Sequence, residues 1–179
     1  KEITIGIDIG GTNSVIGIVD KQGTVICHDS ILTGNFSTPE LFVDECAKVI
    51  NKLLKSIPEQ TGLIGIGIGA PNGNYYKGTI EFAPNLKWKG IIEFVKIFKT
   101  HFDVPTFLTN DANAAALGEL IYGGAKGMKD FIVVTLGTGL GSGFVVNGNL
   151  VYGHDGFAGE LGHTIVFPDK GRQCGCGRK

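Results

Sequence analysis

Hydrophobic and small or polar residues alternate along the start of the chain, a period of two that is typical of β-strands. Isoleucine occupies every second position of residues 3–9, so the pattern predicts a first strand there. Similar runs predict a second strand over 14–20 and a third over 24–32, joined by a hairpin turn at 21–23. Antiparallel strands at this point exclude a simple doubly wound βαβ opening, in which a helix follows the first strand.

The next segment has helical periodicity, because apolar residues recur at intervals of three and four from 43 to 54. Ser37 or Thr38 can cap this helix, Pro39 suits its first turn, and Glu40 can close a capping box with Ser37. Further along, the patterns predict two strands, over 63–69 and 106–109, and two helices, over 91–101 and 111–122.

A glycine-rich stretch at 123–127 is the best candidate for a domain boundary. Strand patterns resume beyond it, over 131–136, 141–146 and 150–152. The order of strand, glycine–threonine turn and strand in residues 7–19 returns in residues 134–146, in pattern more than in identity. We therefore expect one lobe over 1–122 and the beginning of a similar second lobe over 123–179.

Composition excludes several classes of protein. Sixteen Lys and Arg against 17 Asp and Glu give a formal charge of −1, which removes the electrostatic case for a nucleic-acid binder. No apolar run reaches the roughly 18 residues of a membrane span, and Asp8 interrupts the short apolar start, unlike a signal peptide. The four cysteines do not form a disulfide framework, so we expect a cytoplasmic protein without nucleic-acid or membrane partners.

Glycine is in excess, with 29 residues where an average composition would hold about 13. Gly10, Gly11 and Thr12 follow directly on a predicted strand, and such a turn offers backbone N–H groups to phosphate oxygens. Asp8 would repel the phosphates unless Mg²⁺ lay between, so we expect an indirect magnesium contact. A turn carboxylate that caps its own loop is the alternative, and for this motif in isolation it is the more common case.

Gly137, Thr138 and Gly139 open a second glycine turn. A Rossmann fingerprint is excluded because a strand follows, and a P-loop is excluded because the Gly-Lys-Ser/Thr signature is missing. Alternating glycines in a strand can also serve close sheet packing. Two opposed turns that grip one nucleotide's phosphates favour the phosphate-binding interpretation.

Asn110 and Asp111 stand where a strand ends and a helix begins, the edge at which open α/β sheets bind ligands. Asp111 alone is more often an N-cap, but if Asn110 takes the cap, the Asp111 carboxylate is free to accept the proton of an attacking hydroxyl. Glu160 and His163 would share one face of a helical turn, although a surface Glu and a core His are about equally common.

His163, Cys174 and Cys176 have zinc-ligand chemistry, but a closed structural site needs four ligands. A lone C-x-C in a glycine-rich tail can also arise by chance. Three ligands therefore predict a partial zinc motif.

Taken in order, four segments resemble the motifs of the ROK family of sugar kinases, within the actin/hexokinase superfamily, and are most similar to bacterial glucokinases: 7–12, 108–119, 135–143 and 156–163. The resemblance covers essentially the whole chain. It implies an α/β fold of the actin-like ATPase (ribonuclease H-like) type. The N-terminal lobe would hold a mixed five-stranded sheet with helices, followed by the start of a second, similar lobe.

The resemblance also implies residue roles, with Asp111 as the general base on the 6-hydroxyl of a hexose. The residues implied to contact the sugar are Gly73, Asn85, Asn110, Asp111, Glu160 and His163. His163 would bind zinc through one ring nitrogen and face the sugar with the other, and Cys174 and Cys176 would complete three of four zinc ligands. The family's fourth cysteine and a further sugar-binding glutamate would fall just past Lys179, so we expect the N-terminal portion of a longer kinase, incomplete on its own.

The function implied is transfer of phosphate from Mg²⁺-ATP to a hexose, glucose first, by a protein that forms a homodimer or tetramer when full length. A sugar-responsive transcriptional regulator of the same family is the main alternative. It would need a helix-turn-helix ahead of the first strand at Ile3, and an N-terminal extension would revive it, whereas the intact Asp8 and Gly10-Gly11-Thr12 motif favours the kinase. A non-catalytic sugar-binding fragment is a third interpretation. A polyphosphate-dependent kinase is a lesser variant, because the tail is of the zinc type.

Overall fold

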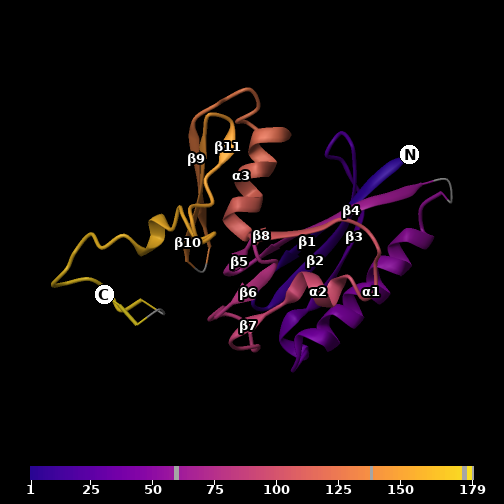
Figure 1. The fold of residues 1–179 in the computed structure, drawn as a ribbon, viewed down its shortest axis with the longest axis horizontal. Coiled ribbons are helices and arrows are strands. Elements are labelled where there is room, and N and C mark those ends of the chain that lie inside the picture. The colour runs from indigo at the N-terminus through magenta and orange to yellow at the C-terminus, as the bar shows by residue number, and fades with distance from the viewer. Residues whose placement is uncertain (59–60, 138, 175–176, 179) are drawn as a thin grey trace.

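The main sheet follows the alternating pattern of the sequence. The computed structural model describes residues 1–58, 61–137, 139–174 and 177–178. Five strands lie in the order β3-β2-β1-β4-β8 (Figure 1). The strands are β1 (Glu2–Ile9), β2 (Asn13–Asp20), β3 (Val25–Leu32), β4 (Gly62–Ala70) and β8 (Thr106–Asn110). β1, β2 and β3 pair antiparallel, whereas β4 runs parallel to β1 and to β8, so the mixed five-stranded sheet is confirmed.

One face of this sheet is buried under two helices, α1 (Pro39–Lys55) and α2 (Phe94–Phe98). The four isoleucines of β1 point into this layer and are at most 3% exposed. An aromatic group of Phe42, Trp88 and Phe94 packs in the same core, with the Phe42 and Trp88 ring centroids 4.9 Å apart. Burial of this apolar surface is the main stabilising contribution to the lobe.

The start of α1 corrects one detail of the expectation. Thr38 is the N-cap, and its Oγ1 accepts a hydrogen bond of 3.3 Å from the backbone N–H of Leu41. The capping box expected between Ser37 and Glu40 is wrong, because the position three residues after this cap is Leu41.

The helix expected over 91–101 is much shorter than predicted. Ile91–Ile92 forms strand β7 of a small sheet in the order β5-β6-β7, with β5 at Gly73–Asn74 and β6 at Thr79–Glu81. Ile92 pairs with Ile80, and both side chains are buried in the core. Burial against β6 therefore outweighs the helical periodicity of this segment, and only Phe94–Phe98 remains helical.

A second meander repeats the opening of the chain. It consists of β9 (Phe131–Leu136), β10 (Leu140–Val146) and β11 (Asn149–Leu150), in the order β11-β10-β9. Asn147 and Gly148 turn this hairpin with positive φ angles of 52° and 74°. The predicted echo of strand, turn and strand is present, whereas the last strand is shorter and earlier than the expected 150–152.

Helix α3 (Asp111–Ile121) lies between the main sheet and β9–β10 (Figure 1). Two 3₁₀ turns, η1 (Thr33–Asn35) and η2 (Leu161–His163), complete the regular structure of the described residues. None of the helices in the described ranges combines the length and apolar character needed to cross a membrane. The division into lobes at residue 122 stays a prediction.

Candidate active site

The two carboxylates that the sequence predicts at the site, Asp8 and Asp111, lie at the ends of β1 and β8. Asp8 lies near the carboxyl end of β1 and Asp111 directly follows β8, with β4 between the two strands. Burial raises the pKa of Asp8, and the negative charge of Asp111 raises it further. Both residues line a cavity of about 1280 Å³ that continues along the sheet face opposite α1 and under α3.

The strand–helix junction places Asn110 and Asp111 as the sequence suggests, with one difference. Asn110 is the N-cap of α3, and its Oδ1 accepts a hydrogen bond of 2.9 Å from the N–H of Ala112. Asp111 Oδ1 accepts from the same N–H at 2.8 Å, so the expectation of an entirely free carboxylate is wrong. This bond orients the carboxylate, which lines the cavity.

The first glycine turn is held in a tight conformation. Gly10 donates its N–H to the carbonyl of Asn13 at 3.0 Å, and a Cβ on Gly10 would lie 2.5 Å from that oxygen. A Cβ on Gly11 would lie 2.7 Å from the backbone oxygen of Asn85. The turn that ends in exposed Thr12 therefore packs against Asn85, so a predicted phosphate turn and a predicted sugar residue are neighbours.

The glycines of the second turn and the strand after it serve two different purposes. Cβ atoms on Gly141 and Gly143 would lie 3.0 Å and 2.6 Å from the Cβ atoms of Ala112 and Ala116, so these two glycines let α3 pack on β10. In contrast, Gly137 and Gly139 have open space where a side chain would be. The backbone there remains accessible to a ligand. Thr138 lies outside the described residues.

Gly73 brings the small sheet against the end of β8. A Cβ on Gly73 would lie 2.4 Å from the carbonyl oxygen of Thr109, the residue before Asn110. Only glycine fits at this approach, so the backbone of β5 borders the predicted sugar site.

Glu160 and His163 lie on the segment after β11, and neither lines the cavity that holds Asp8 and Asp111, whereas His163 lines a second pocket with Cys174. Partial burial raises the pKa of the Glu160 carboxyl and Asp111 adds to the rise, whereas His163 lowers it. Glu160 is therefore close enough to Asp111 and to His163 for their charges to act on it. His163 Nδ1 lies 3.9 Å from Cys174 Sγ. Cys176 lies outside the described residues, and the described part of the chain holds no cluster of three potential metal ligands.

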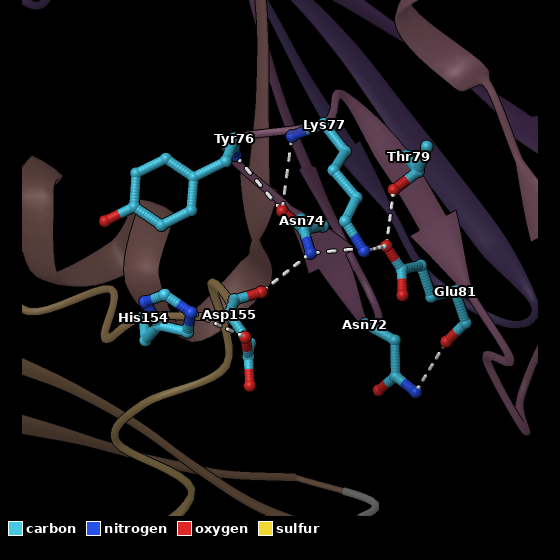
Figure 2. A network of polar contacts seen from close by, with 8 residues as sticks. All are labelled: Asn72, Asn74, Tyr76, Lys77, Thr79, Glu81, His154 and Asp155. Atoms are coloured by element: carbon cyan, nitrogen blue, oxygen red, sulfur yellow. Dashed lines mark hydrogen bonds and ion pairs between the residues drawn. The ribbon is translucent and has the colours of Figure 1, made fainter.

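Sequence reasoning missed two buried polar side chains that contact this segment. Ser142 of β10 is hydrogen-bonded to the backbone on either side of Glu160. Asn74 of β5 donates to the carbonyl oxygen of Asp155 (Figure 2). A serine inside a glycine-rich strand is a weak signal in the sequence, and Asn74 carries none, because its partner lies 81 residues away.

Comparison with known proteins identifies relatives along the whole chain. The model of the ROK family matches residues 4–179. A glucokinase from Streptomyces coelicolor is 39% identical over 176 residues, covering 98% of this chain and 53% of the relative. A xylose repressor from Bacillus spizizenii is 37% identical over 181 residues, covering 98% of this chain and 45% of the repressor. The chain thus spans about half the length of the curated relatives it matches.

Solved structures show the same relationship. The crystal structure of a ROK family glucokinase from Streptomyces griseus, in complex with glucose and AMPPNP, matches with a TM-score of 0.84 at 36% identity. The match covers 99% of this chain and 55% of that one. This similarity confirms the actin-like ATPase fold expected from the sequence.

Proposed function

Because the chain belongs to the ROK family, we propose that its protein transfers the γ-phosphate of ATP to the 6-hydroxyl of a hexose, with glucose preferred. The observation that carries the proposal is that Asp8 and Asp111 lie at the same edge of the sheet, at the ends of β1 and β8, beside a glycine turn. A phosphoryl-transfer site needs a base near the acceptor hydroxyl and backbone donors for the phosphates, and this edge of the sheet offers both.

In this proposal, Asp111 accepts the proton of the 6-hydroxyl as that oxygen attacks the γ-phosphorus. Its orientation by the Ala112 N–H sets the carboxylate before the sugar arrives. Glu160, His163, Asn110 and Asn85 bind the other hydroxyls, and the backbone of Gly73 closes the sugar pocket. Most of the rate enhancement then comes from positioning and from neutralised charge.

The phosphates of ATP lie between the two glycine turns formed by Gly10, Gly11 and Thr12 and by Gly137, Thr138 and Gly139. The backbone N–H groups of Gly11 and Gly139 and the hydroxyls of Thr12 and Thr138 hold them, while the N–H groups of Gly10 and Gly137 close the turns by donating to the carbonyls of Asn13 and Gly139. Asp8 fits an indirect contact to a divalent cation, because burial and the negative charge of Asp111 disfavour ionisation of its carboxyl and a nearby cation would favour it. When bound, Mg²⁺ would neutralise the phosphates, and Asp8 would contact it indirectly.

We also propose a structural zinc ion held by His163, Cys174 and Cys176, with a fourth ligand beyond the chain. The described pair fits, because an imidazole nitrogen and a thiol 3.9 Å apart are suitable zinc donors. Metal content of the full-length protein should be about one zinc per chain, and Cys174→Ser should lower it. Unchanged zinc content in Cys174→Ser would exclude Cys174 as a ligand.

A sugar-responsive regulator is the second candidate, favoured by the 37% identity to a xylose repressor. A non-catalytic sugar-binding protein and a polyphosphate-dependent kinase are lesser variants. The proposed homodimer or tetramer would be tested by light scattering of the full-length protein, and the cytoplasmic location expected from the cysteines stays a prediction.

A phosphoryl-transfer assay tests the proposed function. Full-length protein is incubated with a panel of hexoses and Mg²⁺-ATP, and in parallel with polyphosphate. Formation of glucose 6-phosphate from ATP is the expected result. Hexose binding without turnover would contradict the kinase and favour the regulator or the non-catalytic protein.

A further inference from the structure

The segment from Tyr152 to Leu161 carries Glu160 to the candidate site, although it contains no strand and little helix. Two side chains from other elements hold it by its backbone. Asn74 Nδ2 donates to the carbonyl oxygen of Asp155 at 2.9 Å. At the other end, Ser142 Oγ donates to the carbonyl of Gly159 and accepts from the N–H of Leu161 at 3.0 Å.

The orientation of the Asn74 amide is determined by its neighbours (Figure 2). Oδ1 accepts from the backbone N–H groups of Tyr76 and Lys77, at 3.1 and 3.3 Å. Nδ2 must therefore point toward Asp155 and toward Glu81 Oε1, which lies at 3.2 Å. Asn74 is fully buried, so breaking any of these bonds leaves a polar group without water.

Glu81 completes this arrangement from β6. Its Oε1 also accepts from Thr79 Oγ1 at 2.8 Å and from Lys77 Nζ at 3.2 Å. The polar side chains of this cluster, Asn74, Lys77, Thr79 and Glu81, are thus hydrogen-bonded to one another, which makes the cluster rigid. It donates one further N–H, from Asn74, to the segment that carries Glu160.

Two further contacts join the segment from Tyr152 to Leu161 to the region around Asn74. Tyr152 stacks on Tyr75, the residue after Asn74, with ring centroids 4.4 Å apart and an interplanar angle of 11°. A Cβ on Gly156 would lie 2.8 Å from Asn74 Oδ1, and Gly156 has a φ of 86°. The segment therefore passes over Asn74 at a distance that only glycine permits.

We propose that Asn74 and Ser142 are positioning residues that set the Glu160 carboxylate for the hexose. Ser142 holds the residues immediately before and after Glu160, while Asn74 anchors the segment five residues upstream. The inference rests on the proposed function, since it assigns these residues to the sugar half of the site. Loss of either anchor should weaken hexose binding more than ATP binding. Ser142 stands in the strand that follows the second glycine turn, but its side-chain bonds go to Gly159 and Leu161, and the Asn74 side chain bonds to Asp155.

The test compares full-length variants. Ser142→Ala removes one anchor with a minimal change of volume. Asn74→Asp combined with Glu81→Gln removes the other. In this double variant the new carboxylate at position 74 still accepts from the Tyr76 and Lys77 N–H groups and now also accepts from the new amide at position 81, but it has no N–H for Asp155. Glu81→Gln alone and Lys77→Ala are the matched controls, because both retain the Asn74 bond to Asp155.

Hydrogen exchange of residues 152–161, melting temperature, and KM for hexose and for ATP are measured on each variant. We expect faster exchange confined to this segment and a hexose KM raised about tenfold, with the ATP KM within about twofold and the controls like wild type. Unchanged exchange, an unchanged hexose KM, or equal losses for both substrates would overturn the proposal. If the wild-type protein phosphorylates no hexose, the proposed function fails. The positioning role of Asn74 and Ser142 is then tested by hydrogen exchange and by hexose affinity measured by calorimetry, with the same criteria.

Discussion

Asp8 and Asp111 face each other across Gly69. Asp8 pairs with Gly69 of β4, and a side chain on Gly69 would begin 3.5 Å from the Cα of Asp111. Because glycine has no side chain, nothing at position 69 separates the two carboxylates. Burial is the larger cause of the raised pKa of Asp8 and the charge of Asp111 adds to it, so ionisation of Asp8 costs stability in the folded protein.

Asp8→Asn should therefore stabilise the ligand-free protein. Because the pKa of Asp8 is raised in the folded state, ionisation costs stability, and this cost is complete above the folded pKa and disappears below the unfolded one. We expect the variant to melt up to about 3 °C higher at pH 7.5, with a smaller difference at pH 4. Thermal unfolding in the presence of EDTA measures both values.

Asp103→Asn, which neutralises an exposed carboxylate outside the site, is the control for Asp8→Asn. A variant at Asp8 that is less stable than wild type at pH 7.5 would contradict the repulsion argument. The same Asp8 variant should need more Mg²⁺ for activity, because it loses a negative contact to the metal.

Asp111→Asn tests the catalytic base. The amide retains the oxygen that accepts from the Ala112 N–H, so the helix start is preserved, but it cannot take a proton. We expect kcat to fall about 10²–10⁴-fold with a hexose KM within about threefold of wild type. Steady-state kinetics on the full-length protein decides this, and near-normal turnover would remove Asp111 from the base role.

Two alanine substitutions in the same glycine motif should affect different properties, one the stability of the protein and the other its ATP binding. Gly143→Ala places a Cβ 2.6 Å from Ala116 and 2.9 Å from the Ala112 carbonyl, so it should cost about 1–3 kcal/mol of stability. Gly139→Ala enters open space and should leave the melting temperature unchanged, while raising the KM for ATP. Denaturation and ATP kinetics on both variants measure the contrast. Equal destabilisation by both would show that the motif serves packing alone.

Glu160 should give the hexose KM a distinctive pH dependence. Partial burial and the charge of Asp111 raise its pKa, while His163 opposes the rise. The carboxylate accepts sugar hydroxyls best when ionised, so hexose affinity should be lost as pH falls through a value above the ordinary range for glutamate. In Glu160→Gln, the hexose KM should be higher at pH 7.5 and much less dependent on pH. A wild-type KM that stays constant down to pH 4.5 would contradict this assignment.

Local patterns in the sequence determined much of the main sheet and several site residues. The alternating isoleucines of β1 specify a strand with one buried face, because side chains in a strand alternate between faces. The position of Asn110 before a helix likewise specifies a cap, because the cap bond joins residues only two apart. Such features can be predicted from the sequence alone, since the interacting residues lie within a few positions of each other.

Only the tertiary structure decided features whose partners are distant in the chain. Ile91–Ile92 forms a strand because it pairs with β6, which buries the Ile92 side chain. Gly143 and Gly139 look alike in sequence, yet α3 packs on one and leaves the other open. The meeting of Asp8 with Asp111 and the anchors of Asn74 and Ser142 also depend on packing between separate elements. Periodicity specifies which face of an element is buried, whereas the contacts of that face depend on how the whole chain packs.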